Sequence, residues 1–140
     1  MRDKNTAGFT LIEMLVVIAI IGILSAAVLV ALGPSRNKAK DSRIESDIKQ
    51  AQSVAESLYN PASANPYALV TPTQAQLALI VTDITSQNSG LVIVMNSNQT
   101  AYAMYAQLQS DTSQYYCVDS AGNVKTETSN LPTASNPVCQ

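Results

Sequence analysis

The sequence contains no histidine and no tryptophan, and it has a single phenylalanine. The absence of histidine excludes Ser-His-Asp and Cys-His catalytic centres and most zinc sites, because these require an imidazole as base or ligand. A glycine-rich phosphate-binding loop and a pair of carboxylates at a catalytic spacing are also missing from the sequence. We therefore expect that the chain is not an enzyme and needs no cofactor.

Charged residues are scarce, at 13% of the chain, and the net charge is −2. Domains that bind nucleic acid usually carry a basic stripe or patch on their surface. Here Lys125 is the only cation after Lys49, so nucleic acid is not an expected partner. The length of 140 residues has room for one domain.

The only two cysteines, Cys117 and Cys139, lie in the last quarter of the chain. An even pair of cysteines behind a membrane-directed segment indicates a disulfide formed in an oxidising compartment. The alternative is two separate buried thiols. Two sulfurs without histidine offer too few ligands for a metal, so no metal site is expected there.

One long apolar run, from Phe9 to Leu32, stands out from the otherwise polar sequence. It exceeds the roughly 20 residues that a helix needs to cross about 30 Å of hydrocarbon. The basic residues Arg2 and Lys4 on its short side favour a cytoplasmic N-terminus. The rest of the chain would then face outward, where the cysteines can oxidise.

Three simpler interpretations of this run compete with a special function: a secretory signal peptide, a plain membrane anchor, and a buried core helix, for which the run is too long. A secretory signal peptide has a shorter apolar core and a small-residue cleavage site after it. The best late site here, Ala31-Leu32-Gly33, is followed by Pro34, which is a poor residue at that place. A plain single-span membrane anchor is the second alternative.

Glu13 is the only charged residue in the apolar run. A carboxylate near the start of a membrane span costs on the order of a few kcal/mol, and a plain anchor would gain nothing by keeping it. No lysine or arginine lies within the span, so we expect the partner of Glu13 to come from elsewhere. A newly freed amino group on Phe9 of a neighbouring chain would supply it.

The N-terminal pattern resembles a known signal. Gly8 is followed by Phe9-Thr10-Leu11-Ile12-Glu13 and then by an apolar run containing Ile20-Ile21-Gly22-Ile23-Leu24. This combination is similar to the class III signal of type IV pilins and type II secretion pseudopilins. The resemblance is strong over residues 8–32 and only architectural beyond them.

The resemblance implies that a prepilin peptidase cuts between Gly8 and Phe9 and methylates the new N-terminus, so that Phe9 becomes N-methylphenylalanine. The apolar helix is then kept, first as a membrane anchor and later as the filament core. Glu13 occupies the place of the family's glutamate that pairs with the amino terminus of the adjacent subunit. Ala7 departs from the basic or polar residue that often precedes the glycine, which predicts slower processing.

The resemblance also predicts a domain order: a cleaved leader (1–8), an apolar transmembrane and filament-core helix (9–33), an amphipathic helix half (34–59) and a globular head (60–140). The proline that the family often has within the apolar helix is absent. Gly33-Pro34 instead closes the apolar segment, so any unwinding of the helix in a fibre would occur there.

Residues beyond Pro34 show helical periodicity as far as Tyr59, where Asn60-Pro61 stops the helix. One apolar stripe runs along this segment and is expected to pack on the sheet of the head: Ile44, Ile48, Ala51, Ala55 and Leu58. Two pairs four residues apart, Arg43 with Asp47 and Glu45 with Lys49, are expected to form weak surface ion pairs on this helix.

The head is predicted to contain a proline-rich loop over 60–72, a short helix capped by Thr71 with Pro72 as its first residue, and an antiparallel sheet of three or four strands. The expected strands are 91–95, 101–108, 115–118 and 124–128. The turn 119–123 joins the last two as a hairpin. In 101–108, Tyr102, Met104, Ala106 and Leu108 alternate with Ala103, Tyr105 and Gln107, which is the pattern of a half-buried strand with the second set on its exposed face. Asp111, Asp119 and Asn123 match no calcium motif and are interpreted as turn residues.

The fold class is therefore α+β and pilin-like: a long N-terminal helix packed on a small antiparallel head with one C-terminal disulfide, Cys117–Cys139. This bond would tie down residues 130–140, which have no apolar periodicity. Six tyrosines could form an adhesive or DNA-touching patch, but sheet packing is the simpler interpretation.

The function that the resemblance implies is that of a structural subunit of a type IV pilus or similar filament, serving adhesion, motility, DNA uptake or secretion. Its expected partners are identical subunits, the prepilin peptidase, a membrane assembly platform and, before assembly, the lipid bilayer. The precursor would be a single-pass protein of the cytoplasmic (inner) membrane and the product an extracellular filament. The alternatives are a type II secretion pseudopilin, a DNA-binding competence or minor pilin and, outside the family, a membrane-anchored extracellular protein.

Overall fold

A computed structural model describes residues 8–140, which divide into two compact units with the boundary after Arg36. The predicted leader, apart from Gly8, lies outside the described residues, and so do Arg2, Lys4 and Ala7. Helix α1 (Leu11–Ser57) begins in the first unit and ends in the second. The predicted long helix is confirmed, and Pro34 lies inside it.

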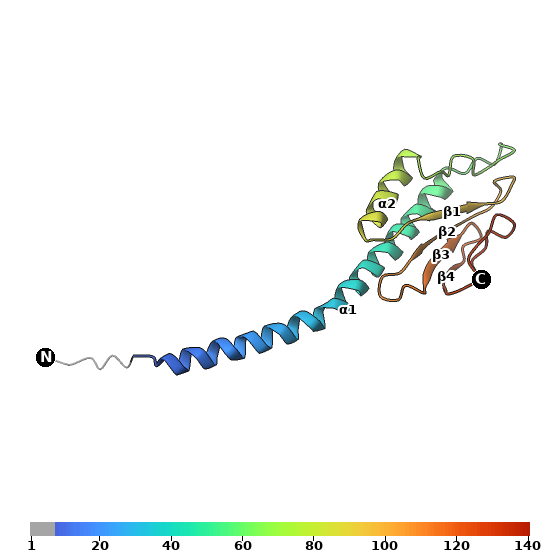
Figure 1. The fold of residues 1–140 in the computed structure, drawn as a ribbon. Coiled ribbons are helices and arrows are strands. Elements are labelled where there is room, and N and C mark those ends of the chain that lie inside the picture. Colours follow the sequence, from blue (N-terminus) through green and yellow to red (C-terminus); the bar gives the residue numbers. More distant parts are fainter. Residues whose placement is uncertain (1–7) are drawn as a thin grey trace. The chain divides into compact units, whose positions relative to one another are not determined.

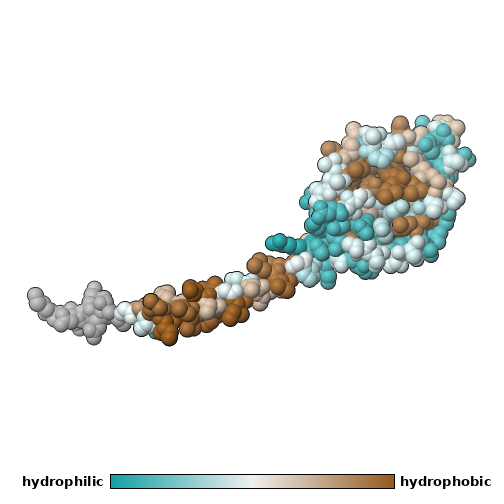
Figure 2. All heavy atoms as spheres, viewed as in Figure 1, coloured by the Kyte–Doolittle hydropathy of each residue, from teal (hydrophilic) through white to brown (hydrophobic). Residues whose placement is uncertain are grey.

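The first unit consists of the apolar part of α1 and the residues just before it. The large hydrophobic side chains there are exposed, with exposed fractions of 82% for Leu11 and 81% for Val30. Figure 2 shows hydrophobic residues covering the visible face of this segment. Among the described residues, α1 is the one helix long and apolar enough to cross a membrane, and none of its apolar window is buried.

The second unit combines the rest of α1 with a short helix and a four-stranded sheet, α2 (Ala75–Ser86), β1 (Val92–Met95), β2 (Tyr102–Gln107), β3 (Tyr115–Asp119) and β4 (Val124–Glu127) (Figure 1). All neighbouring strands are antiparallel, in the order β1-β2-β3-β4. This arrangement confirms the predicted antiparallel sheet, with four strands rather than three. The β3–β4 turn contains Gly122 at a φ of 85°, a conformation that glycine adopts without strain.

The core of this unit lies between the sheet and α1. Ile44, Ile48, Ala51 and Ala55 are fully buried, so the predicted apolar stripe is confirmed as the packing face. Successive residues of a strand point to opposite faces of the sheet. The side chains that the sheet contributes to this core are Tyr102, Met104, Ala106, Tyr116 and Val118.

Strand β2 is more buried than its alternating pattern predicted. Ala103 was expected on an exposed face, yet it is fully buried. The reason is a second cluster on the opposite face of the sheet, where Ala103 packs with Cys117 and Cys139 beside Tyr105. Cys139 comes to this face of the sheet from the C-terminal segment. The alternating pattern of the strand does not indicate which other segment will cover it.

The start of α2 differs from the sequence expectation. Its N-cap is Gln74, whose side-chain oxygen accepts the backbone N–H groups of Gln76 at 2.8 Å and Leu77 at 3.1 Å. Thr71 instead accepts the N–H of Gln74 with its backbone carbonyl, in a turn before the helix. The predicted Thr71 cap was wrong because the helix begins at Ala75 rather than at Pro72, so the free N–H groups of its first turn lie within reach of Gln74 and not of Thr71.

The ion pairs on α1 also differ from expectation. Arg43 binds Asp83 of α2 with two nitrogens, at 2.8 and 3.0 Å, rather than Asp47 on its own helix. Lys49 lies over the ring of Tyr116, 5.5 Å from its centroid, rather than against Glu45. Arg43 prefers Asp83 because planar two-point pairing with a carboxylate is stronger than a single surface contact. Lys49 instead places its charge over the face of an aromatic ring, which attracts cations.

Candidate functional site

The N-terminus of α1 is organised around Thr10 and Glu13. The Glu13 carboxylate accepts the backbone N–H of Thr10 at 2.8 Å and its hydroxyl at 2.7 Å, both with Oε2. In return the N–H of Glu13 donates to Thr10 Oγ1 at 3.3 Å. This is a reciprocal capping box, in which the two residues satisfy N–H groups that the first helical turn leaves free.

The capping box gives Glu13 a local role that the sequence argument overlooked. A glutamate three residues after a threonine, directly before an apolar run, is the known signal for it. The hydrogen bonds of the capping box supply no opposite charge, so the expectation that an amino group of a neighbouring chain pairs with Glu13 stays a prediction. Glu13 also helps to begin the helix.

The same geometry leaves one carboxylate oxygen of Glu13 available. Both local hydrogen bonds use Oε2, and within residues 8–140 no hydrogen bond to Oε1 is formed. Glu13 also lines an open apolar hollow of about 330 Å³, together with Phe9, Ile12, Val16 and Val17. The free carboxylate oxygen can receive an amino group, and the hollow can receive apolar side chains.

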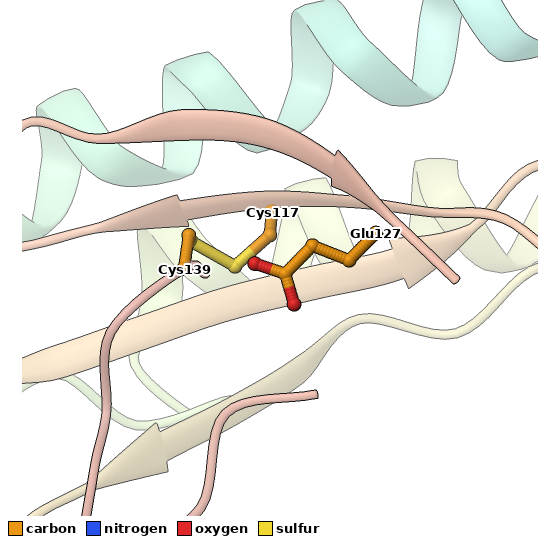
Figure 3. A group of neighbouring side chains, drawn as sticks. All are labelled: Cys117, Glu127 and Cys139. Carbon is orange, nitrogen blue, oxygen red and sulfur yellow. A yellow bond between two sulfur atoms is a disulfide. The ribbon is translucent and has the colours of Figure 1, made fainter. Parts of the chain in front are cut away.

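The second pair of residues predicted from the sequence, Cys117 and Cys139, forms the disulfide of the head. Cys117 in β3 and Cys139 are bonded, 22 residues apart in the chain, and both are buried. Figure 3 shows the Glu127 carboxylate beside the two sulfurs, and the potential ligand atoms of the three residues lie within 4.8 Å of one another. Bonded sulfurs are not thiolates, and thiolates are what zinc requires of cysteine. The group is therefore a covalent staple with a buried carboxylate beside it.

The C-terminal segment is also held by hydrogen bonds. The fully buried Asp119 accepts N–H groups from Ala121, Asn123 and Cys139 and the side-chain amide of Asn123, each at 2.9 or 3.0 Å. Glu127 accepts the N–H of the last residue, Gln140. Asp119 thus organises the hairpin turn and the chain end together. Its role as a turn residue, expected from the sequence, is seen directly.

Three of the six tyrosines serve the packing of the head. Tyr67, Tyr102 and Tyr116 are buried, and the rings of Tyr67 and Tyr102 meet edge to face with centroids 4.9 Å apart. Both of these hydroxyls donate to the carboxylate of Glu56, at 3.1 Å from Tyr67 and 2.7 Å from Tyr102. Burial, followed by this carboxylate, raises the pKa of Tyr67 to about 12.

The predicted site residues thus form two separate groups. Phe9 and Glu13 line one hollow in the first unit, whereas Cys117 and Cys139 form the staple in the second. Thr10 and Glu127 were missed by the sequence reasoning. The spacing of Thr10 and Glu13 contained the signal for the first, and only the fold brings Glu127 to the disulfide.

Comparison with known proteins agrees with the N-terminal pattern. The family model of the prokaryotic N-terminal methylation motif matches residues 3–29. The type IV wide pilus major component PilA4 of Thermus thermophilus is 31% identical over 135 residues, which cover 96% of this chain and 96% of that protein. No solved structure matched the chain.

Proposed function

The chain belongs to the type IV pilin family, and we propose that it is a main subunit of a type IV pilus that polymerises through its N-terminal helix. One observation carries the proposal: the exposed apolar part of α1 carries in its first turn an acid that Thr10 orients and that no cation neutralises within residues 8–140. An apolar surface of this size is stable only in a bilayer or against other apolar helices.

Processing is the first step of the proposed pathway. A prepilin peptidase of the cytoplasmic membrane cuts between Gly8 and Phe9 and methylates the amino group of Phe9. Gly8 and Phe9 precede the first helical residue, Leu11, so the peptide bond between them lies in non-helical backbone. An extended segment is the form in which a protease can reach a peptide bond, which supports this cut.

Assembly is the second step. An assembly platform in the membrane brings the Phe9 amine of one subunit to the Glu13 carboxylate of a neighbour, where Oε1 receives it. The contact joins two different surfaces of the same chain and does not close on itself, so it propagates as a helical filament. Apolar burial in the bilayer is exchanged for burial in the fibre core, and the heads face outward.

The proposal is tested on the native protein. We expect the mature chain to begin at Phe9 with a methylated amine, which mass spectrometry of its N-terminal peptide reads directly. We also expect fibres sheared from cells to contain this chain as their abundant subunit, by electron microscopy and mass identification. A mature chain that begins at Met1, or after the apolar segment, contradicts the proposal.

A type II secretion pseudopilin is the second candidate because it shares the N-terminal motif. The two differ in abundance, since a pseudopilin is scarce in sheared surface fibres. The similarity over 96% of the length of a pilus major component favours the pilus subunit. A DNA-binding pilin is not favoured, because Lys125 is the only cation in the chain after Lys49.

A further inference from the structure

A groove between α1 and α2 in the head carries two carboxylates that the proposed function has not used. It has a volume of about 590 Å³ and is lined by Asp47, Gln50, Val54, Gln76, Leu79, Ile80 and Asp83. Its walls are mixed, because apolar side chains alternate with acids and amides. Leu79 stands 74% exposed at its edge.

Asp47 is the unusual residue of this groove. Its residue exposure is 8%, and its Oδ2 has no hydrogen-bond partner among the described residues. Burial, and then the neighbouring Asp83 carboxylate, raise the pKa of Asp47. A buried carboxylate without a partner is costly, and natural proteins usually pair such groups.

Arg43 forms hydrogen bonds with Asp83 and not with Asp47. It places its guanidinium on both oxygens of Asp83, and this pairing raises the pKa of Arg43. The charge of Arg43 lowers the pKa of Asp47, but by less than burial and Asp83 raise it. No lysine or arginine lines the groove, and Asp47 therefore lacks a hydrogen-bonded positive charge among the described residues.

Helix geometry indicates which residue can supply that charge. Lys38 precedes Asp47 by nine residues, or about two and a half turns, so the two lie on opposite sides of α1 and about 13.5 Å apart along its axis. Lys38 is exposed and forms no salt bridge within residues 8–140. Lys40 is nearly two full turns from Asp47 and lies on the groove's own side.

We propose that Lys38 of a second copy of this chain enters the groove and pairs with Asp47 beside Asp83. The inference rests on the proposed filament function. The ammonium supplies the missing charge, while the apolar walls of Val54, Leu79 and Ile80 contact the four-carbon stem of the lysine. Because donor and acceptor lie on opposite sides of the helix, each copy can use both at once. Such a contact propagates along a filament instead of closing a dimer.

Three observations favour Lys38 over the other head lysines. Lys49 is engaged with the Tyr116 ring on its own head, and Lys40 is on the same side of α1 as the groove. Lys125 lies on β4, directly opposite Cys117 of β3. Residues paired directly across two strands share a face of the sheet, so Lys125 points to the side away from α1.

The test is zero-length crosslinking of native fibres with a water-soluble carbodiimide, which joins an amine to a carboxylate as an amide with loss of water. We expect peptides that link Lys38 to Asp47 or Asp83 in fibres. We expect none in the same chain dispersed as monomers in detergent, because opposite sides of one helix cannot meet. Mass spectrometry identifies the linked residues.

A matched pair of variants completes the test. Lys38→Gln should lower the fraction of the chain recovered in fibres about tenfold, whereas Lys40→Gln should leave it unchanged. Fibres in which the groove acids link to Lys40 or Lys125, or to no lysine, overturn this inference and leave the filament function standing. The absence of this chain from every fibre overturns the proposed function, and the inference with it.

Discussion

Tyr102 and Glu56, 46 residues apart in the chain, are joined by a hydrogen bond of 2.7 Å between the phenol hydroxyl and a carboxylate oxygen. The bond ties the end of α1 to the second strand of the sheet. Burial, and then the hydrogen bond to Glu56 and its charge, raise the pKa of Tyr102, as they do for Tyr67. Both phenols must keep their protons for this arrangement to hold.

The tyrosine pair predicts loss of stability at alkaline pH. A raised folded pKa means that the stabilisation is complete below the unfolded value of about 10 and is lost as the pH rises through the folded value, about 12 for Tyr67. Melting temperatures of the detergent-solubilised chain, followed by circular dichroism, should fall steeply above pH 10. Tyr67→Phe should flatten this decline, and an equally steep decline in that variant would contradict the assignment.

The disulfide predicts a measurable share of the stability of the head. The disulfide joins two cysteines that are 22 residues apart in the sequence, and reduction opens the loop that it closes. The chain-entropy treatment then gives a loss of about 3 kcal/mol in unfolding free energy. Denaturant unfolding with and without a dithiol reductant measures this loss, and mass spectrometry of the untreated protein counts its thiols. Two free thiols in the native chain would remove the prediction.

The two roles of Glu13, in capping the helix and in pairing with a neighbouring subunit, can be tested separately. Glu13→Gln keeps an amide oxygen that can accept the N–H of Thr10, so the capping box survives while the charge is lost. With this variant as the only subunit, processing at Gly8 should continue and fibre growth should stop. Normal fibres from Glu13→Gln cells would show that the charge has no role in pairing with a neighbour.

A control variant isolates the capping contribution. Thr10→Val removes both the hydroxyl donor to Glu13 and the acceptor of its N–H, and keeps the charge. Loss of such a cap typically costs about 1 kcal/mol of helix stability. We expect fibres of Thr10→Val to form in reduced amount, as electron microscopy of sheared material can show. A complete block would mean that the capping box itself is required for assembly.

Asp47 predicts opposite effects on the monomer and on the fibre. Because its folded pKa is raised, its charged form at neutral pH costs stability, and that cost disappears as the pH falls through the raised folded pKa towards the unfolded value of about 4. Asp47→Asn should raise the melting temperature of the detergent-solubilised chain at pH 7 by roughly 4 °C, as about 1 kcal/mol would. The same variant should yield fewer fibres. A less stable monomer would contradict the first expectation.

The strands and the stripe of α1 were predictable from the sequence because each follows a simple period. Ile44, Ile48, Ala51 and Ala55 recur at helical spacing, and the hairpin at 119–123 is rich in turn residues. These signals are local, and local signals survive folding when one face of an element is buried.

The missed contacts depend on residues that only the fold brings together. Arg43 had an acid four residues away, but the stronger partner, Asp83, comes from another helix. Ala103 was expected to be exposed because the sequence of its strand contains no signal that Cys139 packs against it. The Thr10–Glu13 pair is different, because a threonine followed by a glutamate three residues later is a local pattern that the sequence contains.

The disulfide between Cys117 and Cys139 has a consequence for the proposed filament when it meets proteases. Residues 133–136, between the two cysteines, are exposed and offer an obvious place for cleavage. A single cut there leaves both fragments joined through sulfur, and Asp119 still accepts the N–H of Cys139. A nicked subunit therefore keeps its outer surface, and the damage becomes visible on a gel only after reduction.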